Sequence, residues 1–215
     1  LGLASLWLLV SEVERAEADR IRLETRITAQ QVARRLETWI DDRLTVPQYL
    51  SSRDFTSTAD AEHRFSALAA PFLELYPGIQ ALNFVTPDGV IRVVTPEATN
   101  LQALGMDLDE HEVEGVRAAI DRARTAVGPA RTPVVDFFQG GTGVAVYQSI
   151  RDRRGQLLGL VNCVFRVDEL VDQCLHEDDL RRHYRFGLVD ETHREAYLHG
   201  VGEDDEPHQW PFATI

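Results

Sequence analysis

The first part of the chain has the pattern of one long helix. From Ser11 to Leu44 the sequence contains neither Gly nor Pro and is rich in Glu, Arg, Ala, Leu and Gln, which favour helix. Apolar residues recur every three or four positions, as expected for one buried helix face, at Ala29, Ala33, Leu36, Ile40 and Leu44. The first half of this stretch is charged on most sides, so it either stands in solvent or pairs with a copy of itself. Pro47 is expected to end the helix.

A second amphipathic helix follows a polar loop. Ser57 or Thr58 can cap its first turn, and Tyr76-Pro77-Gly78 is placed to stop it. Pro71 is expected to kink it. Its buried face is predicted at Ala61, Phe65, Leu68, Phe72 and Leu75.

The pattern then changes from helix to strand. Residues 79–86 and 90–95 are rich in β-branched and apolar side chains and flank Pro87-Asp88-Gly89, which predicts a hairpin. After a loop over residues 96–110, an apolar stripe predicts a third helix over residues 112–127, with Gly128 placed to cap it. Further strands are predicted at residues 133–138, 144–150 and 156–167.

This order of elements predicts an α+β fold. A long N-terminal helix and a five-stranded antiparallel sheet with an inserted helix form a PAS-like domain. Beyond a short helix over residues 168–175, the segments 185–190 and 195–199 resemble the first hairpin of a second, similar unit. The chain is therefore interpreted as one PAS-like domain followed by the start of another.

Composition excludes one class of partner. The 22 basic residues are all Arg, and 35 acidic residues leave a net charge of −13, which repels phosphate backbones and argues against nucleic acid. The first ten residues, LGLASLWLLV, are uncharged and cover about half of the roughly 20 residues that a membrane span needs. They are interpreted as the outer end of a transmembrane helix, with a buried helix start or a signal-peptide remnant as alternatives.

Motifs for catalysis, metals and cofactors are missing from the sequence. The seven His are dispersed, and the chain has no H-E-x-x-H, G-x-S-x-G or C-x-x-C. Cys163 lies in an apolar run and is expected in the core, with a disulfide to Cys174 left open. Gly140-Gly141-Thr142-Gly143 joins two strands, so it is read as a hairpin turn and not as a phosphate loop. No cofactor and no enzymatic activity are predicted.

Several ordered motifs resemble a known sensor family. They are Tyr76-Pro77-Gly78-Ile79, the P-x-x-x-N-x-x-x-L-G-x-D spacing that begins at Pro96, and the Thr132 segment followed by Gly155-x-x-x-Gly159. Together, over residues 64–175, these motifs resemble the CHASE domain, an extracytoplasmic sensor module of histidine kinases, diguanylate cyclases and plant cytokinin receptors. Two features depart from the family pattern. Ser149 stands where the family usually has Pro, and the purine-binding Asp of the plant receptors has no clear counterpart, Glu97 being the nearest acidic residue.

The resemblance implies a domain organisation. Residues 1–10 would end a transmembrane helix, residues 11–46 would form a stalk and dimerisation helix, and residues 47–175 would form the membrane-distal sensor domain. Residues 176–215 would begin the membrane-proximal unit. The resemblance also implies a homodimer in the cell membrane, attached through the N-terminal helix, with this part periplasmic or extracellular.

The resemblance further implies a ligand pocket between the sheet and its covering loops. The ligand classes considered are an adenine derivative, an amino acid and a carboxylate. Arg92 could hold a carboxylate or phosphate with its planar fork, or face solvent as an ordinary strand residue. Asn83 lies mid-strand, where a buried amide needs partners.

The other candidate site residues lie on the covering loop and on later strands. Loops on rigid scaffolds often carry binding groups, and here they offer Thr95, Glu97 and Asn100, although Asn100 could equally cap a loop or helix. Thr132 either contacts ligand or supports the backbone. Phe137 and Tyr147 are candidates for an apolar pocket wall.

The sequence thus predicts a non-catalytic, small-molecule sensor domain of a transmembrane receptor, of histidine kinase or diguanylate cyclase type. The alternative is a ligand-free module for dimerisation or protein docking.

Overall fold

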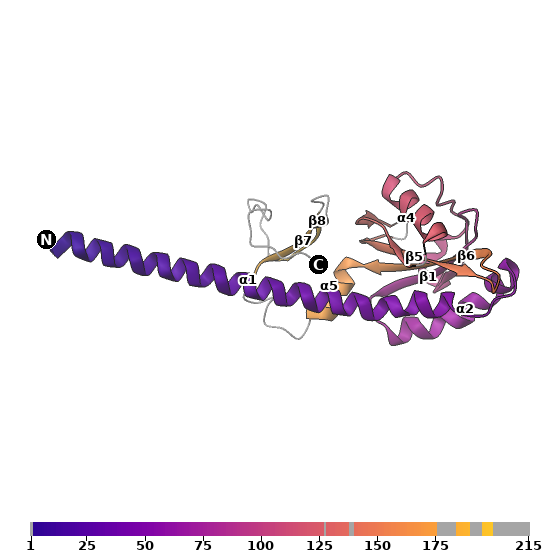
Figure 1. Ribbon diagram of the computed structural model, residues 1–215, viewed down its shortest axis with the longest axis horizontal. Helices are drawn as coiled ribbons and strands as arrows, with labels where there is room; N and C mark the ends of the chain where they lie inside the picture. Colours follow the sequence, from indigo (N-terminus) through magenta and orange to yellow (C-terminus); the bar gives the residue numbers. More distant parts are fainter. Residues whose placement is uncertain (1, 127, 138–139, 176–183, 190–194, 200–215) are drawn as a thin grey trace. The chain divides into compact units, whose positions relative to one another are not determined.

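The computed structural model describes residues 2–126, 128–137, 140–175, 184–189 and 195–199 (Figure 1). Backbone contacts divide the chain into a smaller unit that includes the first helix as far as Trp39, and a larger unit formed by residues 40–201. Among the described residues no helix combines the length and the apolar character that crossing a bilayer requires. The side chains of residues 1–11, on which the interpretation as a membrane segment depends, lie outside the description.

Helix α1 runs from Gly2 to Ser51. Its predicted stripe is confirmed, since Ala33, Leu36 and Leu44 are buried. The prediction that Pro47 ends the helix is wrong, because Pro47 lies inside it.

The packing of the last turns of α1 explains why Pro47 is tolerated there. A proline within a helix costs about 3 kcal/mol through a lost hydrogen bond and a steric clash. Here Leu44, Val46 and Leu50 are buried in the main core, and burying one such side chain contributes about 1.5–3 kcal/mol. This burial offsets the proline penalty, so the helix continues to Ser51.

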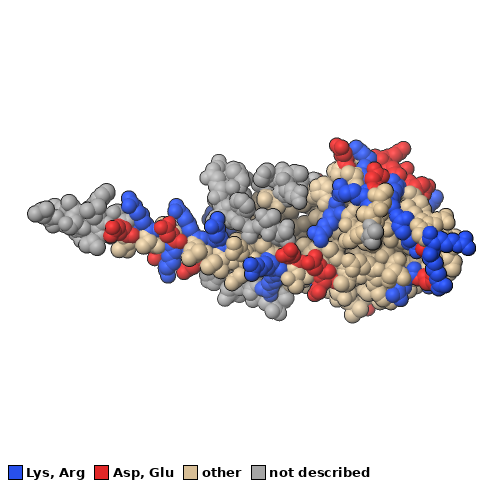
Figure 2. All heavy atoms as spheres, in the orientation of Figure 1, with Lys and Arg blue, Asp and Glu red and all other residues tan. Residues whose placement is uncertain are grey.

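Basic and acidic side chains alternate along the earlier part of α1 (Figure 2). Arg20 pairs with Glu17 at 2.6 Å and with Glu24 at 3.8 Å, and Arg22 pairs with Asp19 at 3.4 Å. Such exposed pairs, three or four residues apart, each stabilise a helix by only about 0.3–0.5 kcal/mol. These ion pairs favour the helix in a segment whose side chains face solvent instead of a hydrophobic core.

Helix α2 runs from Thr58 to Leu75 and begins as predicted. The hydroxyl of Ser57, its N-cap, accepts from the backbone N–H of Asp60 at 3.1 Å. Of the predicted stripe, Ala61 and Phe65 are fully buried, and Leu68 and Phe72 are partly buried against the core. The prediction for Leu75 is wrong, because this residue at the end of the helix is exposed, and the unpredicted Ala69 is buried instead. The helix continues through Pro71.

The larger unit is built on one antiparallel sheet. Its strands are β1 (Ile79–Val85), β2 (Ile91–Thr95), β3 (Ala130–Arg131), β4 (Val135–Asp136), β5 (Thr142–Arg151) and β6 (Leu157–Arg166). Their spatial order is β2-β1-β6-β5-β3, and β4 also pairs with β5. The last strand therefore lies at the centre beside the first, which is the PAS-like arrangement. The predicted α+β class is confirmed.

The third predicted strand, residues 133–138, is only partly found. Of two short strands in this region, β4 lies inside the predicted range and β3 precedes it, so the sheet has six strands instead of five. Pro133 lies between them, and because proline has no N–H it cannot donate to the ladder. The edge of the sheet is broken at that point.

The two faces of the sheet carry separate cores. The last turns of α1 and all of α2 cover one face, where Phe65, Leu82, Phe84 and the free thiol Cys163 are buried. Figure 1 shows α4 on the opposite face. The predicted core position of Cys163 is confirmed, and its thiol is free. The side chain of Cys174 lies outside the described residues.

The second face is covered by the connection between β2 and β3. It consists of α3 (Glu97–Asn100), a 3-10 turn (Leu101–Ala103) and α4 (Glu114–Thr125). Helix α4 buries Val116, Ala119, Ile120 and Ala123. Its C-cap is Ala126, whose N–H bonds to the carbonyl of Arg122, so the predicted capping by Gly128 is not found.

Beyond the sheet, β6 continues directly into α5 (Val167–Leu175). The strands β7 (Phe186–Val189) and β8 (Glu195–His199) then form an antiparallel hairpin. This hairpin agrees with the predicted strands. Most of the predicted segment 176–215 lies outside the described residues.

Candidate functional site

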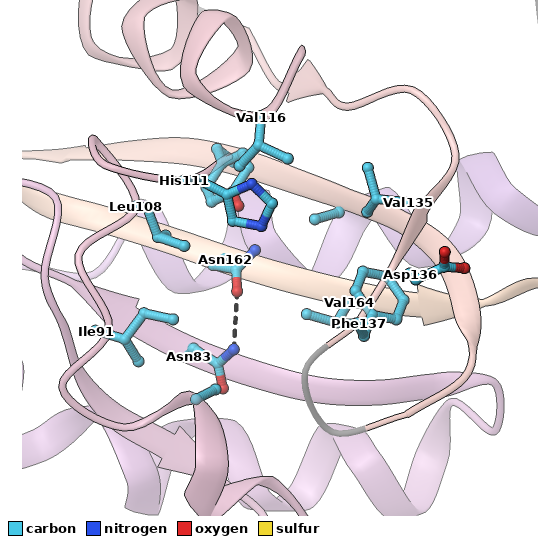
Figure 3. Close-up of a pocket in the computed structure, with 13 residues that line it drawn as sticks. Asn83, Ile91, Leu108, His111, Val116, Val135, Asp136, Phe137, Asn162 and Val164 are labelled. Atoms are coloured by element: carbon cyan, nitrogen blue, oxygen red, sulfur yellow. Dashed lines mark hydrogen bonds between the residues drawn. The ribbon is translucent and has the colours of Figure 1, made fainter. Parts of the chain in front are cut away.

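The face of the sheet beneath α4 contains a cavity of about 40 Å³. One water needs roughly 10–15 Å³ of such space, so the cavity has room for a small polar group of a few heavy atoms. It is lined by Asn83, Ile91, Ala103, Leu108, His111, Val116, Val135, Asp136, Phe137, Ala145, Tyr147, Asn162 and Val164. Figure 3 shows its labelled residues, with Asn83 and Asn162 between the Ile91–Leu108 side and the Phe137 side.

The floor of the cavity is a row of side chains set by strand register. Asn162 on β6 pairs with Asn83 on β1 and with Tyr147 on β5. Directly paired residues in an antiparallel sheet project from the same face, so the three side chains are neighbours. The next row contains Ala145 opposite Val164, and the small alanine leaves room above the sheet.

The two amides of the floor contact each other. Asn83 Nδ2 donates to Asn162 Oδ1 at 2.8 Å, a bond drawn in Figure 3. The residues are only 1% and 3% exposed. Within the described part of the chain, Asn83 Oδ1 and Asn162 Nδ2 have no hydrogen-bond partner. The pair therefore retains one unpaired acceptor and one unpaired donor. Flipping the side-chain amides of both residues exchanges their O and N atoms but leaves the same count.

The roof of the cavity is held onto strand β2 by backbone bonds. Ile91 accepts from the N–H of Gly105 at 2.8 Å and donates to the carbonyl of Met106 at 2.9 Å. The N–H of Leu108 donates to the carbonyl of Gly89 at 2.9 Å. Gly89 has a φ of 89°, as predicted for this turn. The covering loop is thus fixed as an extension of the sheet.

His111 approaches the cavity from the roof as a neutral side chain. Its Nδ1 accepts from the N–H of Val113 at 3.0 Å, so a neutral ring carries its proton on Nε2. Burial lowers the pKa of His111, and the Glu112 carboxylate only partly opposes this effect. The guanidinium of Arg117 donates to the backbone carbonyl of His111 and helps to fix its position.

The only formal charge on the lining belongs to an acidic residue. Asp136 is exposed at the rim and accepts from the hydroxyl of Thr142 at 2.9 Å. Burial raises the pKa of Tyr147, so its phenol stays protonated. The lining includes no Arg or Lys. Exposed Asp136 and half-buried Phe137 mark where the cavity approaches solvent.

Three of the eight predicted site residues line this cavity: Asn83, Phe137 and Tyr147. Arg92 does not, because the register of β1 and β2 shifts between Phe84 and Val85. Phe84 pairs with Val93 and Val85 pairs with Ile91, so Arg92 is the extra residue of a bulge. Its side chain is exposed.

The remaining four predicted residues have other positions. Thr95 donates to the Ser66 hydroxyl at 3.3 Å, on the α2 side of the sheet. Glu97 is exposed in the first turn of α3. Asn100 is buried and donates to the carbonyl of Pro96 at 2.9 Å, which secures the loop. The Thr132 hydroxyl accepts from the N–H of Ala145 at 3.0 Å and so supports the backbone.

Sequence reasoning missed several lining residues, above all Asn162, His111 and Asp136. A signal for Asn162 was present, because it is the one amide inside the apolar run of β6. His111 and Asp136 lie in segments without periodicity, and only the folded loop brings them to the cavity. The described residues contain no group of His, Cys, Asp or Glu that could hold a metal ion.

A comparison with protein-family models gives a match at residues 87–198, just over half of the chain, to the CHASE domain. The chain belongs to the CHASE domain family. The matched region begins in the β1–β2 turn and extends through the cavity, α5 and the following hairpin. CHASE domains are sensor modules, and the resemblance expected from the sequence is confirmed. A search of curated proteins finds no match.

Several solved structures with the same fold are ligand-binding domains of chemoreceptors. The domain of the Pseudomonas aeruginosa PAO1 amino acid chemoreceptor PctC, in complex with GABA, has a TM-score of 0.60 at 16% identity, over 86% of this chain and 77% of that one. The sensory domain of the Campylobacter jejuni chemoreceptor Tlp3 with isoleucine bound has a TM-score of 0.61 at 7% identity, over 86% and 73%.

A third structure is an extracellular ligand binding receptor from Desulfohalobium retbaense, with a TM-score of 0.57 at 17% identity. It is matched over 71% of this chain, which spans only 27% of that receptor. At these identities the three matches show a shared sensor-domain fold.

Proposed function

We propose that this CHASE domain is the extracytoplasmic, small-molecule-binding part of a transmembrane signalling receptor of the histidine kinase or diguanylate cyclase type. The observation that carries the proposal is the cavity between the sheet and its roof, where two buried amides hold unused hydrogen-bonding atoms. Small-molecule sites combine apolar walls with a few placed polar groups, and this cavity has that composition. The similar chemoreceptor domains named above bind GABA and isoleucine, which supports a ligand of small size.

Strand β6 offers a path for the signal. Asn162 and Val164 belong to the cavity, β6 ends at Arg166, and α5 begins at Val167. A ligand that moves the floor therefore acts on α5 without an intervening loop. To change a two-state equilibrium from 1:99 to 99:1, the ligand must favour one state by about 5.5 kcal/mol.

Attachment to the membrane and dimerisation belong to the same proposal. In α1, Val13, Ile21, Leu23 and Ile27 are exposed apolar side chains among charged neighbours. A helix of this kind is suited to pair with a second copy of itself. Residues 1–10 would continue it as the end of a transmembrane helix.

A thermal-shift screen of the chain tests the proposal. The library holds amino acids, carboxylates, adenine derivatives and nucleosides. A ligand at 100 times its Kd stabilises the fold by about 2.7 kcal/mol, which moves Tm by several degrees.

Two variants locate the site of any hit. Ala145→Leu fills the cavity floor and is expected to abolish the shift. Arg92→Ala changes an exposed bulge outside the cavity and is expected to retain it. A hit that persists in Ala145→Leu places the binding site elsewhere. No hit across the library favours the docking or dimerisation role.

A further inference from the structure

The unused polar atoms of the cavity specify a kind of ligand. Asn83 Oδ1 is an acceptor and Asn162 Nδ2 is a donor, and both are buried without a partner in the described part of the chain. A buried polar atom left unpaired costs about as much as a lost hydrogen bond. A ligand that pairs both atoms recovers this cost, whereas one that pairs a single atom recovers half.

The charges of the residues that line the cavity limit which ligands it can bind. Asp136 is the only lining residue with a formal charge at neutral pH, and it is acidic. His111 and Tyr147 are both held in their neutral forms by burial. A carboxylate placed here would offer acceptors only, would leave Asn83 Oδ1 unpaired, and would meet no cation on the lining.

We propose that the cavity recognises a neutral, planar group that presents one hydrogen-bond donor beside one acceptor, as a carboxamide does. The donor of that group bonds to Asn83 Oδ1, and its acceptor receives the N–H of Asn162. This assignment rests on the proposed function, because it names the ligand chemistry of the same cavity. The apolar surfaces of Phe137 and Val135 cover the rest of the group.

The cavity is closed over the two amides, since neither unused atom is exposed to solvent. Binding therefore requires the rim to move outward, and Phe137 is the one apolar lining side chain that is not fully buried. Small probe molecules can test the hydrogen bonding of the two amides while requiring only a small displacement of the rim.

Acetamide, acetamidine and acetate form a matched set of such probes. They have the same shape, but acetamide offers a donor and an acceptor, acetamidinium offers donors only, and acetate offers acceptors only. Each is titrated into the ¹⁵N-labelled chain, and the side-chain amide signals of Asn83 and Asn162 are followed by NMR. We expect acetamide to shift both signals and to bind at least about tenfold more tightly than acetate, since one hydrogen bond is worth about that ratio.

The variant Asn162→Asp reverses the prediction in a specific way. Its carboxylate still accepts the bond from Asn83 Nδ2, while the atom that faces the ligand changes from donor to acceptor. In the pH range where the new carboxyl is ionised, which a pH titration of the variant locates because burial raises the pKa of a carboxyl, acetamidinium should replace acetamide as the best probe by about tenfold. A second variant, Asn83→Leu/Asn162→Leu, should bind none of the three.

Two results overturn this assignment. One is that acetate binds as well as acetamide in the unaltered chain. The other is that none of the probes shifts the Asn83 and Asn162 signals. If the library screen meanwhile gives a hit that Ala145→Leu abolishes, the sensor function stands and only the ligand chemistry is wrong. If that screen also fails, both proposals fall.

Discussion

The amide pair of the cavity floor should lower the stability of the fold. Replacing one buried polar partner leaves the other unsatisfied, whereas replacing both by apolar groups of similar shape is neutral or stabilising. Leucine has the same branching as asparagine at Cγ. We therefore expect the double variant Asn83→Leu/Asn162→Leu to be more stable than the unaltered chain, although it can no longer bind ligand through these side chains.

The magnitude follows from the contacts of the pair. The unaltered chain keeps Asn83 Oδ1 and Asn162 Nδ2 unpaired, at about 1–3 kcal/mol each, and gains about 0.5–1.5 kcal/mol from the 2.8 Å bond between the amides. Removing both amides should therefore raise the free energy of unfolding by about 0.5–5.5 kcal/mol. The single variant Asn162→Leu leaves both polar atoms of Asn83 unpaired, so it should gain nothing and lose up to about 2 kcal/mol.

Urea unfolding followed by circular dichroism measures these differences. The midpoint should increase in the double variant at an unchanged m-value, which reports the same surface exposed on unfolding. Asn100→Leu is the matched control. Asn100 is also buried and its Oδ1 is likewise unpaired, but its Nδ2 donates to the carbonyls of Pro96 and Gln80. Its replacement leaves those two backbone carbonyls without this donor, so it should destabilise the fold by about 1–3 kcal/mol. A double variant less stable than the unaltered chain would refute the reasoning.

Three further predictions concern pH, packing and capping. Burial lowers the pKa of His111 below its ordinary value of 6.5, so as the pH falls the unfolded chain takes up a proton before the folded chain does. The free energy of unfolding should therefore decrease below about pH 6.5. His111→Asn keeps an acceptor for the Val113 N–H and should make this decrease smaller in urea unfolding measured from pH 7.5 to 5. Gly159→Ala should destabilise the fold by about 1–3 kcal/mol in urea melts, because its new Cβ would lie 2.5 Å from Phe84 Cε2, whereas Gly128→Ala meets nothing within 4 Å and should be neutral. Ser57→Ala should lower stability by about 0.5–2 kcal/mol in the same assay, through loss of the α2 cap.

The sequence by itself determined the elements that depend on local chemistry. Most of the apolar stripe of α2, its Ser57 cap and the Gly89 turn follow from residues a few positions apart, and these features are present. The order of strands and helices was enough to predict the PAS-like sheet. The CHASE motifs were readable for the same reason, since each is a short run with fixed spacing.

Predictions from local sequence were wrong where contacts between residues distant in the sequence determined the stability of an element. Pro47 should end a helix, but burial of Leu44, Val46 and Leu50 in the core outweighs the penalty. Pro133 was expected inside a strand, but it interrupts the edge of the sheet. An edge strand pairs with only one neighbour, so no second set of hydrogen bonds compensates for the N–H that proline lacks.

The position of the cavity and the set of residues that line it depend on the tertiary structure alone. Asn83 and Asn162 are 79 residues apart in the sequence and meet only because β6 pairs with β1 in one particular register. For Arg92 the strand pattern left a ligand-binding and a solvent-facing position open, and the structure decides between them, because Arg92 is the extra residue of a bulge and its side chain is exposed. Strand register depends on the packing of the whole sheet, so a pattern along one strand can indicate that an amide is buried but cannot identify the group that it faces.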